Sequence, residues 1–119
     1  MTHLLAAPGA VVAALEVSGI RATSDPRNVA PPGVWVEYRS GERLTSSKVS
    51  CDVDAMIVVP GPANGDALRA LDILAAEVMA ALDVAGLPWT ESTLGSVGSP
   101  TTGDPLPALT LTITTTQEA

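Results

Sequence analysis

The feature that most constrains the fold is a long amphipathic helix predicted over residues 64–86. Its apolar residues recur at three- and four-residue spacing, which places them along one stripe of a helix with 3.6 residues per turn. These residues are Ala67, Leu68, Leu71, Leu74, Ala75, Val78, Leu82 and Ala85. Asn64 or Asp66 can cap the free amides of the first turn, and Gly86 suits a left-handed C-terminal cap. Such a helix is roughly 30 Å long, so the rest of the chain must pack against it.

Two apolar residues of this segment, Ile73 and Met79, lie off the main stripe. They widen the apolar surface beyond what one sheet face requires. Either they make a wide contact with the core of their own chain, or they meet another subunit. We expect the helix to pack on a sheet and to offer Ile73 to a neighbour. The residues expected against the sheet are Leu68, Leu71, Leu74, Val78 and Leu82.

The remaining segments predict a single α+β domain over residues 1–119. A first helix is expected over residues 1–19, with Pro8 in its opening turn. Whether residues 3–7 extend that helix through Pro8 or form a separate turn stays open. Alternating apolar and polar residues predict strands, and an uninterrupted apolar run makes residues 48–60 the central one. The other expected strands are residues 21–23, 34–38, 89–94 and 109–114.

Polar or proline-containing stretches separate these elements. A turn at 24–26, an extended lead-in at 28–33, loops at 40–47 and 95–105, and a frayed tail at 115–119 are expected. The order of the expected helices and strands along the chain predicts a four- to five-stranded, mostly antiparallel sheet with both helices packed on one face.

Composition narrows the classes of partner. Aromatic residues make up 3% of the chain and Phe is absent, so the core is expected to be aliphatic and an aromatic-lined pocket is not expected. The net charge is −7, and from residue 61 onward Arg69 is the only basic residue. Such a surface is expected to repel nucleic-acid phosphates. Without a long apolar run or a secretory signal, we expect a soluble protein made in the cytoplasm.

Candidate catalytic residues are few, and no enzyme activity, cofactor or metal site is expected. Cys51 is the single cysteine and His3 the single histidine, so they form no metal-ligand set, and Cys51 is most simply a small buried residue. The same histidine would have to serve as base for any serine nucleophile in residues 92–99. Asp52 and Asp54 lie two apart on a strand and share a face, which suits either a divalent cation, an acid/base pair or a solvated strand end.

Five residues are candidates for contacts with other subunits or partners: Trp35, Arg39, Arg43, Ile73 and Trp89. Trp35 and Trp89 either pack in the core, or one of them anchors an interface on the face away from the helices. Arg39 and Arg43 either sit in a solvated loop or pair with the acidic second half of an adjacent copy.

The arrangement resembles the tail terminator, or tail completion, proteins of long-tailed bacteriophages, especially those that infect actinobacteria. The resemblance is carried by placement. A first helix ends in Gly-Ile (AAPGAVVAALEVSGI), a proline-rich lead-in meets a strand (NVAPPGVWVEY), and a central apolar strand (DAMIVVPG) precedes the long helix (DALRALDILAAEVMAALDVAG). The resemblance continues in the last part of the chain, which is a strand, a polar loop and a strand that ends in Thr. The departure is Pro8, which we expect to shorten or bend the first helix.

The resemblance implies a non-enzymatic ring, a hexamer in related proteins, at the head-proximal end of the virion tail. Such a ring caps the tail tube, ends its growth, meets the head-tail connector and lets DNA pass through its lumen without sequence-specific binding. Two alternatives remain: another connector component, such as a head-closure or stopper protein, or a small acidic enzyme or ligand-binding α+β domain. The loops at 40–47 and 95–105 are expected to become ordered on contact with the tube or the connector.

Overall fold

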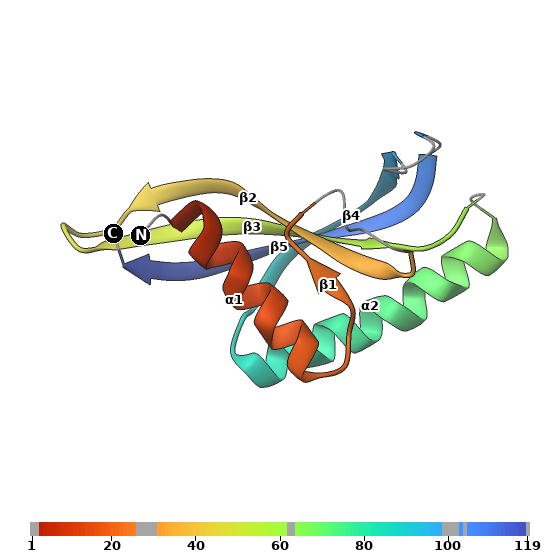
Figure 1. The fold of residues 1–119 in the computed structure, drawn as a ribbon, viewed down its shortest axis with the longest axis horizontal. Helices are drawn as coiled ribbons and strands as arrows, with labels where there is room; N and C mark the ends of the chain where they lie inside the picture. Colours follow the sequence, from red (N-terminus) through yellow and green to blue (C-terminus); the bar gives the residue numbers. More distant parts are fainter. Residues whose placement is uncertain (1–2, 26–30, 62–63, 99–102, 104, 119) are drawn as a thin grey trace.

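The computed structural model describes residues 3–25, 31–61, 64–98, 103 and 105–118. Within them the chain forms two helices and one five-stranded sheet with the strand order β1-β2-β3-β5-β4 (Figure 1). Strand β1 runs parallel to β2, and the other neighbours are antiparallel. The predicted α+β class and the central position of β3 are confirmed. The elements are α1 (His3–Val17), β1 (Ala22–Thr23), β2 (Gly33–Arg43), β3 (Lys48–Val58), α2 (Gly65–Ala85), β4 (Trp89–Gly98) and β5 (Pro105–Glu118).

Helix α2 begins and ends at the residues that its sequence signals predict. The Asn64 side chain accepts a hydrogen bond from the Ala67 amide at 3.0 Å, which satisfies one free donor of the first turn. Gly86 adopts the left-handed conformation at φ 72°, and the Leu87 amide then donates to the Leu82 carbonyl at 2.9 Å. These two caps satisfy backbone groups at the ends of the helix, so the helix stops at these residues.

Helix α1 runs from His3 through Pro8 to Val17, so residues 3–7 extend the helix, which is one of the two alternatives that the sequence leaves open. Pro8 therefore does not shorten the helix. Its ring is buried, and the missing amide removes one backbone hydrogen bond. Gly19 then closes the helix at φ 80°, and Ile20 is buried as expected.

The core lies against one face of the sheet, which we call the inner face. Alternate residues of β3, from Val49 to Ile57, and Val59 just after the strand join side chains of α1 and α2 in one buried cluster. Both helices contact β3 and β5, and they contact each other. One helix residue departs from the prediction: Leu68, expected against the sheet, is 50% exposed, because it lies at the edge of the buried stripe. Leu71, Val78 and Leu82 are buried as expected, and Leu74 is partly buried.

The strands are longer than their apolar patterns predict. Strand β2 continues through a bulge at Arg39 to Arg43, so the expected loop at 40–47 shrinks to residues 44–47. Strand β4 runs to Gly98 instead of ending at 94, and β5 runs to Glu118 instead of fraying after 114. These polar extensions are strands because their backbone groups pair with a neighbouring strand. At Gly41 a Cβ would overlap the Tyr38 hydroxyl, so glycine makes room for that ring.

The molecule is elongated, with extents of 47 × 28 × 23 Å. The β2–β3 hairpin projects beyond α1 at one end of the long axis, and the beginning of α2 lies at the other end (Figure 1). Residue 26 of the predicted turn at 24–26, residues 28–30 of the predicted lead-in at 28–33, and residues 99–102 and 104 of the predicted loop at 95–105 lie outside the described residues. Neither described helix combines the length and apolar character needed to cross a membrane.

Candidate interface surfaces

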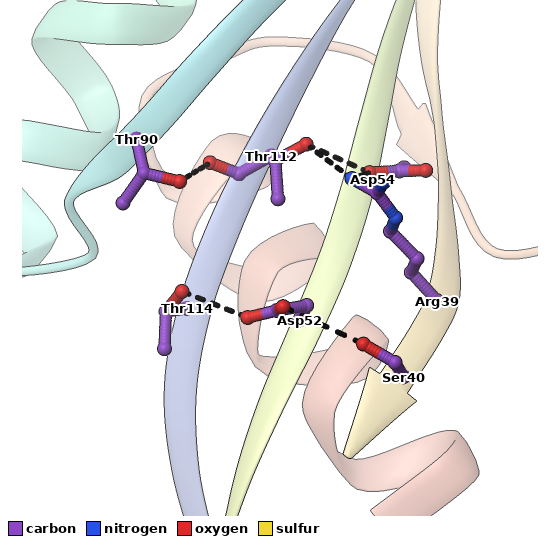
Figure 2. Close-up of polar contacts among 7 residues, drawn as sticks. All are labelled: Arg39, Ser40, Asp52, Asp54, Thr90, Thr112 and Thr114. Atoms are coloured by element: carbon purple, nitrogen blue, oxygen red, sulfur yellow. Dashed lines mark hydrogen bonds and ion pairs between the residues drawn. The ribbon is translucent and has the colours of Figure 1, made fainter. Parts of the chain in front are cut away.

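The outer face of the sheet, opposite the inner face, carries a polar network at its centre (Figure 2). Asp54 lies opposite Thr112 on β5, and Asp52 lies opposite Thr114. The Thr112 hydroxyl donates to Asp54 Oδ1 at 3.0 Å, and the Thr114 hydroxyl donates to Asp52 Oδ1 at 2.9 Å. From the other side, the Ser40 hydroxyl donates to Asp52 Oδ2 at 3.4 Å. The two carboxylates share a face, as predicted, and each is held by hydroxyl donors.

Arg39 closes this network from β2. Its Nη1 donates to the Thr112 hydroxyl at 3.2 Å and lies 3.8 Å from Asp54 Oδ1 (Figure 2). The expectation that Arg39 sits in a hairpin loop is wrong, because the bulge between Tyr38 and Ser40 keeps it in β2 and turns it onto the outer face. Its guanidinium is therefore partly occupied within its own chain.

Two titratable groups of this region depart from their ordinary pKa. Burial, together with the carboxylate of Asp54 directly across the strand pair, raises the pKa of Glu37. Burial and the neighbouring Asp52 charge raise the pKa of the Cys51 thiol. Cys51 points into the core as predicted, and a protonated, buried thiol is unreactive. Among the described residues, no three His, Cys, Asp or Glu side chains are grouped in a way that could hold a metal ion.

The outer face becomes apolar toward one end of the sheet. Met56, Val58 and Ala108 are buried there, with Trp35, Val97 and Leu106 packed against them. Because the inner side of the same stretch of β3 is also buried, this part of the strand is covered on both faces, as its apolar run predicts. The Trp35 indole nitrogen is buried, and among the described residues it has no hydrogen-bond acceptor.

The end of the β2–β3 hairpin, which we call the hairpin tip (residues 43–48), is a second surface. The amides of Leu44 and Thr45 both donate to the Lys48 carbonyl, at 3.0 and 3.2 Å. The Arg43 Nε donates to the Thr45 carbonyl at 3.3 Å. These bonds order the turn, and they leave Leu44 54% exposed between two basic residues, Arg43 and Lys48.

Helix α2 and strand β4 form the third surface. Ile73 is 58% exposed on the side of α2 away from the core. Trp89 is exposed at the start of β4 and lies opposite Ile113, so it belongs to the inner face. Between α2 and β4 runs an apolar groove of about 300 Å³. It is lined by Leu68, Leu71, Asp72, Ala75, Ala76, Met79, Leu94 and Leu109.

The five candidate residues therefore do not form one site. Trp35 and Arg39 lie on the outer face, Arg43 lies at the hairpin tip, and Ile73 and Trp89 lie on the third surface. Sequence reasoning missed Leu44 and Leu94. A leucine inside the polar run SGERLTSS is a signal that could have identified Leu44. For Leu94 the sequence holds no such signal, because its exposure depends on how far α2 covers β4.

Comparison with known proteins adds no relative: a scan against protein-family models and a search of curated proteins each returned no match for this chain.

Proposed function

We propose that this protein is a tail terminator: a non-enzymatic structural subunit whose ring, a hexamer, caps the tail tube of a long-tailed phage. The ring ends polymerisation of the tube protein, meets the head-tail connector and lets DNA pass through its lumen. It is made in the host cytoplasm and becomes part of the virion. The proposal rests on the placement of elements that resembles this family and on one structural observation.

That observation is the exposure of large apolar side chains on separate parts of the molecule. Leu68, Ile73 and Leu94 are exposed on α2 and β4, and Leu44 is exposed on the hairpin tip. Val17 and Val84, at the ends of α1 and α2, are exposed as well. Exposed apolar groups that gather on distinct surfaces are typical of protein interaction sites. A subunit of a cyclic ring needs two such surfaces, since each copy meets its two neighbours through different faces.

The charge of the chain supports passage of DNA through the ring. With a net charge of −7, the subunit has few basic groups to exchange for the counterions of DNA phosphates. A channel built from such subunits is expected to let DNA slide without binding it.

The proposal is tested by adding the purified protein to polymerising tail-tube protein of the phage that encodes it. A terminator stops growth of the tube, so the lengths seen by negative-stain microscopy shorten as its concentration rises. A connector on the head side leaves tube growth unchanged and serves as the control. A protein that stays strictly monomeric at high concentration and does not bind purified tubes would contradict the proposal.

A further inference from the structure

The apolar groove between α2 and β4 has the chemistry of a docking site. Leu94 is 61% exposed on one wall and Leu68 is half exposed on the other, while the floor is closed by Leu71 and Leu109. The free energy falls when another apolar group removes such side chains from water. The groove has one acidic lining residue, Asp72.

The hairpin tip carries the complementary groups. It presents one exposed leucine, Leu44, between the basic residues Arg43 and Lys48. Its backbone bonds already hold the turn in place, so docking does not require much ordering of the chain.

The charges of the two regions also match. Residues 64–98 carry Asp66, Asp72, Glu77, Asp83 and Glu91 against a single basic residue, Arg69. Residues 43–48 carry Arg43 and Lys48 and no acidic residue, while Glu42 precedes them on β2 and Glu118 lies opposite Lys48 on β5. A basic tip is therefore attracted to the acidic half that holds the groove, and it is repelled by a second tip.

The tip cannot reach the groove of its own chain. Leu109, in the groove, pairs with Ile57, whereas the tip ends at Lys48 on the same strand. The nine positions between residues 48 and 57 of an extended strand span roughly 30 Å. Figure 1 shows the hairpin projecting away from the region where α2 and β4 lie together. A hairpin tip that docks into this groove must therefore come from another molecule.

We propose that the hairpin tip of one copy docks into the apolar groove of the next, with Leu44 in the groove and Arg43 beside Asp72. The contact joins two different surfaces, so it is head-to-tail and is of the kind that can close into a ring. It rests on the self-assembly in the proposed function and names the surfaces that carry it.

Cysteine crosslinking between two preparations of full-length protein tests the contact. Ser46→Cys, which keeps Leu44, is prepared separately from Ala76→Cys, and the two are mixed and mildly oxidised; both positions are exposed, and the native Cys51 is buried. We expect a disulfide-linked dimer from this mixture. The control mixture replaces Ala76→Cys with Val17→Cys, an exposed position at the end of α1. Equal crosslinking in both mixtures would overturn the proposal.

Charge exchange tests the polar half of the contact. Arg43→Asp and Asp72→Arg are each expected to weaken self-association by about tenfold, and the double variant is expected to regain most of the loss. Sedimentation velocity measures the association, and circular dichroism checks that each variant is folded. Losses that simply add in the double variant would contradict the pairing.

Failure of this inference can be told apart from failure of the proposed function. If the wild-type protein caps tubes but cysteines at positions 46 and 76 do not crosslink, the contact is wrong and the terminator proposal stands. If the two positions crosslink but the protein leaves tube growth unchanged, the contact stands and the terminator proposal fails. A wild-type protein that remains monomeric overturns both.

Discussion

At the scale of single residues, two carboxylates facing each other across β2 and β3 make the outer face sensitive to pH. Glu37 lies directly opposite Asp54, and the pKa of Glu37 is raised by burial and by that charge. Its pKa is thus higher in the folded chain than in the unfolded chain, so the folded chain binds more protons between the two values. The stability that proton binding by Glu37 adds to the fold is fully present below pH 4.5, the ordinary pKa of this carboxyl. It is lost as the pH rises through the pKa that Glu37 has in the folded chain.

Glu37→Gln is therefore expected to raise the free energy of unfolding at pH 7, on the order of 0.5 kcal/mol, because it removes a like charge directly opposite another. The gain should disappear as pH falls below the ordinary value of the Glu37 carboxyl. Urea unfolding of both proteins over pH 4–8 measures it. Glu42→Gln is the control, since Glu42 lies opposite Ser50 instead of a carboxylate. A Glu37→Gln gain that is the same at every pH would contradict this account.

Thr112 joins two other members of the polar network, Arg39 and Asp54. Its hydroxyl accepts from Arg39 and donates to Asp54, and the residue is buried. Thr112→Val preserves the shape and removes both bonds, so we expect a loss of about 1–2 kcal/mol in the free energy of unfolding. Thr116→Val on the exposed part of the same strand should change it by less than about 0.5 kcal/mol. Equal losses in the two variants would mean that the network adds no stability.

At the scale of elements, helix α2 depends on its caps. Asn64→Ala removes the acceptor of the Ala67 amide and is expected to cost about 1 kcal/mol. Asn64→Asp keeps a side-chain acceptor at the same place and should keep most of the stability. Thermal unfolding followed by circular dichroism compares the three proteins. Were Asn64→Asp as unstable as Asn64→Ala, the loss would have another cause than the cap.

The way in which each helix and strand forms explains which parts of the fold could be predicted from the sequence. Both ends of α2 were predictable, because Asn64 and Gly86 act through bonds to residues within a few positions. The ends of β2, β4 and β5 were not, because polar segments become strands only when a distant strand pairs with them. Among the candidate interface residues, the exposure of Ile73 follows from helical periodicity. The partners of Arg39 do not, since Thr112 lies 73 positions away in sequence.

At the scale of the whole molecule, Ile73 tests whether α2 has a second role outside the core. Because its side chain is mostly exposed, Ile73→Glu should change the free energy of unfolding by less than about 0.5 kcal/mol. If Ile73 contacts a neighbouring subunit, the variant loses rings in negative-stain images, whereas Ile73→Leu keeps them. If Ile73→Glu still forms rings and keeps its full stability, Ile73 does not belong to the interface.

The position of β3 between β2 and β5 has a mechanical consequence. Its pairing with both neighbours extends from Val49 to Val58, and in antiparallel ladders the hydrogen bonds lie perpendicular to the strands. A pull on the hairpin tip along the strand direction draws β2 and β3 the same way, so it loads the bonds between β3 and β5 together, in shear, instead of opening them one after another. A subunit held by its hairpin would carry tension through the middle of its sheet, along β3 and β5.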